Sequence, residues 1–101
     1  MPTYAMLSTL GPDGWATLRE NPERLRQVND EVESLGLKVV GQYALMGEFD
    51  FLNILEAPDE SSMARAAVML AARGTLKTRT LQAIPIEEFI AALKQDKEAA
   101  G

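Results

Sequence analysis

Two amide side chains lie within segments that are otherwise apolar, and they are the residues best suited to binding chemistry. Gln42 and Asn53 flank a short stretch around Gly47 that joins two runs typical of β-strands. A connecting loop of two or four residues places Gln42 opposite Asn53, whereas a loop of three or five residues breaks this pairing. If both amides converge with Tyr4 in an apolar cleft, they resemble the lining of a small-ligand site. The alternative is that the two amides bond to each other and satisfy themselves.

Asp50 and Tyr43 lie close to these amides in the sequence. Asp50 follows the Gly47 turn, where a carboxylate can serve as a general base or contact a ligand. An Asp beside a glycine turn more often accepts amide protons from that turn, and this is the interpretation that we favour. Tyr43 falls opposite Leu52 in the same register as the amide pair. The predicted ligand-binding residues are therefore Gln42, Asn53, Tyr4, Tyr43 and Asp50, and we predict no catalytic residue.

The composition removes most of the common catalytic and metal-binding groups. The chain has no histidine and no cysteine, so the usual general base, the usual zinc ligands and any thiolate nucleophile are missing. Catalysis would have to use Asp, Glu, Lys or Tyr, or a bound cofactor. Asp59 and Glu60 have no partners at the spacing of a metal site. We therefore expect neither a metal nor a cofactor, and the composition weighs against an enzyme.

The charge of the chain bears on its partners and its location. Its 15 acidic and 10 basic residues give a net charge of -5, which disfavours contact with nucleic acid or an anionic membrane. Lys77 and Arg79 can hold an anion, but a lone basic pair on an edge strand usually prevents edge-to-edge aggregation, and we favour this role. No apolar run reaches the roughly 20 residues that span a bilayer, and the first residues lack the layout of a signal peptide. These features favour a cytoplasmic protein.

Hydrophobic periodicity and turn residues predict the elements that position these side chains. They are, in order, a strand over 3–9, a Gly-Pro-Asp-Gly turn at 11–14, a helix from Trp15 to Leu35 that restarts at Pro22, strands over 37–45 and 49–57, a helix capped by Asp59, a strand over 75–82 and a short helix with Phe89, Ile90 and Leu93. Gly36 and Gly74 are placed to end helices. We expect one domain over 1–93, followed by a frayed tail over 94–101.

This order of elements predicts an α+β fold. Strand, helix, strand, strand, helix, strand is the order of the ferredoxin-like βαββαβ fold, with a four-stranded antiparallel sheet and here an extra C-terminal helix. We expect the first and third strands to be central and to run parallel to each other. Both helices of this fold lie on one face of the sheet, so the opposite face needs another cover.

The two predicted central strands are apolar on both faces. The first strand presents Ala5 and Leu7 on one face, and the third presents Leu52 and Ile54. Soluble monomers seldom expose an apolar patch of this size. We therefore predict a homodimer in which two sheets pack face to face. The alternative is a monomer whose C-terminal helix folds back over the open face.

Three stretches of the sequence resemble the GYD domain family of small bacterial and archaeal proteins. These are the start of the first strand with the helix after it, the hairpin from Gln42 to Phe51, and the segment from Thr75 to Phe89. The hairpin matches the naming motif at Gly47 and Asp50 but has Phe49 in place of tyrosine, so any chemical role of that phenol is missing. The family is similar to the dimeric α/β-barrel group, which includes ligand domains of transcriptional regulators and cofactor-free monooxygenases. The resemblance thus implies the dimeric α/β-barrel type of fold.

Three functions fit these observations. The first is a homo-oligomeric binding or sensing module that takes a small, mostly apolar molecule between two sheets or between sheet and helix. The second is an enzyme of the cofactor-free monooxygenase or isomerase type, with Asp50 as the base and Tyr43 or Asn53 orienting the substrate. The third is a structural subunit of a larger assembly. The enzyme requires that Asp50 line a cavity, whereas the structural subunit requires that the cleft be closed by side chains.

Overall fold

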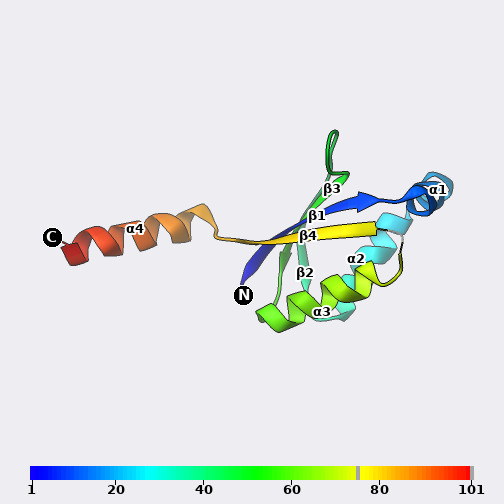
Figure 1. Ribbon diagram of the computed structural model, residues 1–101. Coiled ribbons are helices and arrows are strands. Elements are labelled where there is room, and N and C mark those ends of the chain that lie inside the picture. Colours follow the sequence, from blue (N-terminus) through cyan, green and yellow to red (C-terminus); the bar gives the residue numbers. More distant parts are fainter. Residues whose placement is uncertain (75, 101) are drawn as a thin grey trace.

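The computed structural model describes residues 1–74 and 76–100 and shows an α+β fold (Figure 1). Its elements are β1 (Thr3–Leu10), α1 (Pro12–Glu20), α2 (Arg24–Ser34), β2 (Lys38–Ala44), β3 (Phe51–Glu56), α3 (Glu60–Ala71), β4 (Leu76–Ala83) and α4 (Ile86–Ala100). Thr75, the first residue of the last predicted strand, and Gly101, the last of the predicted tail, lie outside the described residues. The fold class predicted from the sequence is confirmed. The extra helix is longer than predicted, because the Ala, Lys, Glu and Gln residues after Leu93 favour helix.

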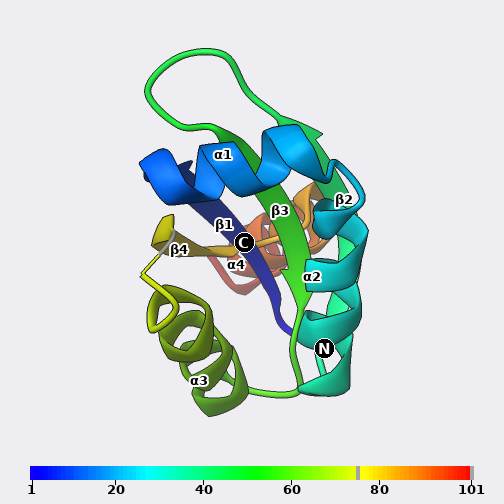
Figure 2. The same ribbon diagram turned by 90° about the vertical axis from the view of Figure 1, so that its right-hand side faces the viewer.

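The four strands form one antiparallel sheet in the order β2-β3-β1-β4, which is the ferredoxin-like arrangement. β1 and β3 are central, as predicted, but they run antiparallel, so the predicted parallel direction is wrong. The crossover through α1 and α2 makes β1 parallel to β2, and the hairpin then turns β3 against both. Helices α1, α2 and α3 cover one face of the sheet, and α4 lies on the other side (Figure 2).

The first helical region begins earlier than predicted and breaks where predicted. Gly11 is the N-cap of α1 and Pro12 its first residue, so the predicted Gly-Pro-Asp-Gly turn is instead a helix N-terminus. Proline fits the first helical position because its missing N–H has no partner there, and Asp13 in the first turn favours the helix dipole. The restart at Asn21-Pro22 is confirmed, since α1 ends at Glu20 and α2 starts at Arg24.

The hairpin between β2 and β3 has the register predicted for a four-residue loop. Leu45 N donates to Asp50 O at 2.8 Å, which closes a loop of residues 46–49. Gly47 has a φ of 139°, a conformation that favours glycine. Gln42 therefore pairs with Asn53, as predicted for this loop length. A one-residue irregularity between Val39 and Gly41 shifts the register, and Val39 packs against the core.

The core lies between the sheet and the helices that cover it. It consists of Tyr4, Met6, Val32, Leu37, Leu55, Ala57, Met63, Ala66 and Leu70. Small residues on α3 let that helix approach the sheet closely, since Ala66 is fully buried. The Asp59 side chain caps α3 by accepting a hydrogen bond from Ser62 N at 2.7 Å, as predicted.

The other face of the sheet carries a second set of apolar residues, which we call the open face. Its members are Ala5, Leu7, Tyr43, Leu52, Ile54 and Leu81, which alternate with the helix-facing residues of their strands. Tyr43 is 58% exposed and Leu81 is 50% exposed. The predicted apolar character of both faces of β1 and β3 is thus confirmed.

Helix α4 does not fold back over the open face but points away from the sheet (Figures 1 and 2). The molecule is 59 Å long, and its radius of gyration is 16.2 Å, whereas a compact domain of this length has about 13 Å. Ile86, Phe89, Ile90 and Leu93 form one exposed apolar side of α4, which we call the α4 stripe. The molecule thus presents two apolar surfaces, the open face and the α4 stripe.

Candidate functional site

A cavity of about 270 Å³ lies between the sheet and helices α1 and α2. Its lining is Ser8, Leu10, Gly14, Thr17, Leu18, Arg24, Leu25, Val28, Gln42, Phe51, Asn53 and Arg73. The strands provide the floor, the two helices provide the walls, and Arg73 comes from the turn after α3. Trp15 holds α1 against the sheet, with its ring centroid 6.2 Å from that of Phe51. The helical break at Pro22 lets α1 and α2 take different directions over one sheet and enclose this space.

The two predicted amides both line the cavity. Gln42 Oε1 accepts a hydrogen bond from Asn29 Nδ2 of α2 at 2.8 Å. Asn53 Oδ1 is buried and has no hydrogen-bond partner among the described residues. Gln42 is thus satisfied by a helix rather than by Asn53. The amides face the helices together with Phe51, and the opposite face of the sheet is the one available to a second sheet.

Asp50 does not line this cavity. Its Oδ2 accepts a hydrogen bond from Leu10 N at 2.9 Å, and its own N–H donates to Ser8 O at 2.9 Å. The carboxylate therefore fastens the end of β1 to the start of β3. We expected amide protons from its own turn, but the donor is 40 residues away in the sequence.

The two predicted tyrosines lie apart from the amide pair and from each other. Tyr43 is on the open face. Tyr4 is buried near a second hollow of about 250 Å³ between α3 and β4. Burial raises the pKa of the Tyr4 phenol, and the carboxylates of Glu60 and Asp59 raise it further. Of the five predicted site residues, Gln42 and Asn53 therefore meet in the cavity, whereas Tyr4, Tyr43 and Asp50 lie elsewhere.

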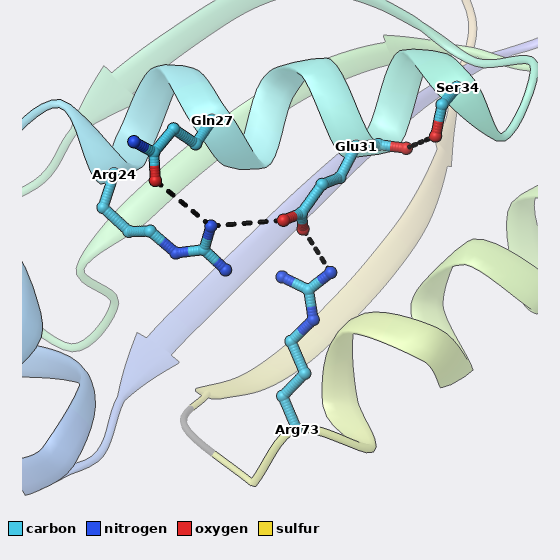
Figure 3. A network of polar contacts seen from close by, with 5 residues as sticks. All are labelled: Arg24, Gln27, Glu31, Ser34 and Arg73. Carbon is cyan, nitrogen blue, oxygen red and sulfur yellow. Dashed lines mark hydrogen bonds and ion pairs between the residues drawn. The ribbon is translucent and has the colours of Figure 1, made fainter.

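An ion-pair cluster borders the cavity, and the sequence analysis did not identify it. Glu31 of α2 lies between two guanidinium groups (Figure 3). Its Oε1 is 3.1 Å from Arg24 Nη1, and its Oε2 pairs with Arg73. The hydrogen bond from Arg73 is the main cause of a lowered Glu31 pKa, and the bond from Arg24 adds to it. Arg24 and Glu31 lie seven residues apart, a helical spacing visible in the sequence, but Arg73 joins them only through the fold.

Two other predicted features concern charged residues and membranes. Lys77 and Arg79 of edge strand β4 pair with Thr9 and Leu7 and lie outside the cavity lining.

Among the described residues, no group of acidic side chains is arranged to hold a metal ion. No helix in this part of the chain combines the length and apolar character needed to cross a membrane.

Comparison with known proteins identifies relatives of the whole fold. The GYD domain model matches residues 4–93, a range that includes the sheet, the cavity and the α4 stripe. A protein of Thermus thermophilus is 53% identical over 95 residues, which cover 93% of this chain and 100% of the relative. That relative is named a glutamine synthetase and cystathionine beta-lyase binding protein. No solved structure matches the chain.

Proposed function

This chain belongs to the GYD domain family, and we propose that it is a small homo-oligomeric module that binds other proteins. The observation that carries this proposal is the 53% identity with a protein named for binding glutamine synthetase and cystathionine β-lyase, since the match covers that whole relative. We propose the corresponding two enzymes of this chain's own organism as its partners. The cytoplasm is the compartment that we propose, as the cysteine-free composition favours.

The open face supports the homo-oligomeric part of this proposal. Leu7 and Leu52 lie side by side at its centre, with Ala5 and Ile54 paired next to them. A face of this kind packs well against a second copy, because two sheets can stack about 10 Å apart with their side chains interdigitated. We propose a homodimer that pairs through this face. A structural subunit of a larger assembly would also pair through this face, but it would bind no enzyme.

The α4 stripe supports the enzyme-binding part. It is an amphipathic helix surface with the spacing i, i+3, i+4, i+7, which suits a hydrophobic groove on another protein. Phe89 is 46% exposed and Leu93 is 52% exposed, although both are large and apolar. Helix α4, which carries the stripe, extends away from the three helices that cover the sheet (Figure 1). We propose that it contacts the enzyme.

The cavity supports a small-molecule ligand in addition to the protein partners. Most of its lining is apolar and its floor carries the amides of Gln42 and Asn53, which is the usual composition of a ligand site. We propose that Gln42 and Asn53 contact this ligand, while Tyr4, Tyr43 and Asp50 serve other roles. An enzyme that uses Asp50 as its base is not favoured, because that carboxylate lies outside the cavity lining.

The enzyme-binding proposal is tested with a double substitution in the α4 stripe. Phe89→Ser with Ile90→Ser is expected to weaken binding to purified glutamine synthetase and cystathionine β-lyase by at least tenfold, measured by biolayer interferometry. Val68→Ser with Met69→Ser is the matched control, since these neighbouring apolar residues are exposed on α3. The control should bind as the wild type does. Equal binding by both double variants would place the contact elsewhere, and absence of binding by the wild type would refute the proposed function.

A further inference from the structure

The two arginines give the cavity one positively charged end. Arg24 and Arg73 belong to the lining, which contains no Asp or Glu from the part of the chain that the structure describes. Both guanidiniums pair with the single carboxylate of Glu31, so the cluster keeps one excess positive charge. This charge is notable in a chain whose net charge is -5. An anion entering the cavity would therefore find a favourable potential at this end.

The guanidiniums also keep free hydrogen-bonding capacity. A guanidinium has five N–H donors. Arg24 uses its Nη1 for Glu31 at 3.1 Å and for Gln27 at 3.4 Å, and Arg73 uses Nη2 for Glu31 (Figure 3). The side chains of Arg24 and Arg73 are 33% and 38% exposed, so their remaining donors are within reach of an entering molecule. Two such groups suit a carboxylate, which accepts paired N–H bonds.

The rest of the lining suits an apolar chain with limited polar character. Leu10, Leu18, Leu25, Val28 and Phe51 make up its apolar part. Besides the two arginines and Thr17, the polar groups lie on the floor, where Ser8 is 6% exposed and Asn53 Oδ1 has no partner among the described residues. A buried amide oxygen without a donor is costly, and most buried polar groups in native proteins are hydrogen-bonded to protein or to ordered water. The floor thus offers polar contacts beneath an apolar space.

We propose that this cavity binds a small carboxylic acid with a short apolar tail. Arg24 and Arg73 hold the carboxylate, and the tail lies against Leu18, Leu25 and Val28. This inference rests on the proposed ligand-binding role of the cavity and adds the class of ligand. The cavity of 270 Å³ corresponds to roughly nine water molecules of liquid volume, which sets the size of the acid at roughly that number of non-hydrogen atoms.

Hexanoate, hexanamide and inorganic phosphate separate the contributions of charge and tail. In ¹H–¹⁵N NMR titrations, hexanoate is expected to shift the amide signals of residues in the lining and to bind at least tenfold more tightly than hexanamide or phosphate. Arg73→Gln should weaken hexanoate binding about tenfold and leave hexanamide binding unchanged. Arg26→Gln is the matched control, because Arg26 pairs with exposed Glu23 alone among the described residues and lies outside the lining. This control should bind hexanoate as the wild type does.

The possible results distinguish failure of the ligand class from failure of the site. If hexanoate and hexanamide bind equally, or if Arg73→Gln does not change hexanoate binding, recognition of a carboxylate is refuted, while the proposal that the cavity binds a ligand stands. If phosphate binds as tightly as hexanoate, the proposed role of the apolar tail is refuted. If neither hexanoate nor hexanamide binds at millimolar concentration, the proposed ligand-binding role of the cavity fails as well. Chemical-shift changes confined to the open face would also overturn the assignment.

Discussion

Replacing Leu81 and Tyr43 with serine is expected to separate the proposed homodimer without unfolding either subunit. Leu81 is 50% exposed on β4 and Tyr43 is 58% exposed on β2. The half of each side chain that is already buried stabilises one subunit by about 1 kcal/mol, so each change should lower the free energy of unfolding by about that amount and leave the subunit folded. The exposed halves become buried when two open faces pack together. The substitutions should therefore act on association more strongly than on folding.

The size of the effect follows from the exposed fractions. Full burial of a large apolar side chain contributes about 2 kcal/mol, so burying the exposed half of Leu81 contributes about 1 kcal/mol per subunit. A symmetric dimer contains the contact twice, which gives about 2 kcal/mol and raises the dissociation constant roughly 30-fold. Tyr43 contributes a similar amount. The two strands lie on opposite edges of the sheet, roughly 14 Å apart, so the effects should add to about three orders of magnitude.

Sedimentation equilibrium over a range of protein concentrations measures this change directly. The wild type should be dimeric at micromolar concentration, and the double variant should be monomeric with an unchanged circular dichroism spectrum. Val68→Ser serves as control, because Val68 is 67% exposed on α3, in the helical layer opposite the open face. Identical dissociation constants for the wild type and the double variant, or a wild type that is monomeric throughout, would refute the pairing through the open face.

Three further predictions concern the stability of the subunit. Glu31→Gln should lower the free energy of unfolding at pH 7 by about 1 kcal/mol, since its ion pairs are partly exposed. Because folding lowers the Glu31 pKa, this stabilisation is present above the ordinary value of 4.5 and is lost as the pH falls through the folded-state value. Urea titrations should therefore show the difference from wild type shrinking in acid, and a constant difference would contradict this cause. Asp50→Ala should lower the free energy of unfolding in urea by about 1–2 kcal/mol through the lost bond from Leu10 N, without changing hexanoate affinity. Glu48→Ala, in the adjacent hairpin loop, should leave this free energy unchanged. Met6→Ala should cost about 2–5 kcal/mol because Met6 is 1% exposed, whereas Met46→Ala at a fully exposed position should change stability by less than about 0.5 kcal/mol in the same assay.

Local patterns were sufficient to predict most of the elements and the hairpin register. The restart at Asn21-Pro22 follows from the chemistry of helix N-termini. The pairing of Gln42 with Asn53 follows from loop length, because a four-residue loop fixes which residues face each other. Strand alternation likewise predicted the two apolar faces of β1 and β3. Sequence alternation did not show which of these faces the helices cover, so it left open whether the amides face a helix or a second sheet.

The unpredicted parts of the site depend on contacts between distant segments. Asp50 finds its donor at Leu10, and Arg73 joins Glu31 from a turn that follows another helix. Neither contact can be predicted from the spacing of residues within one segment of the sequence. The separation of Tyr4, Tyr43 and the amides likewise depends on position along each strand and on which face each side chain occupies. A list of polar residues in apolar segments therefore predicted two members of the cavity but not its charged end.

Native mass spectrometry of the chain mixed with purified glutamine synthetase and cystathionine β-lyase from its own organism tests the central claim most directly. It reports the number of 11.1 kDa chains and the bound enzyme in a single measurement. We predict complexes in which each enzyme carries this chain in even multiples. Only free enzyme together with a lone 11.1 kDa chain would contradict both the pairing and the binding function.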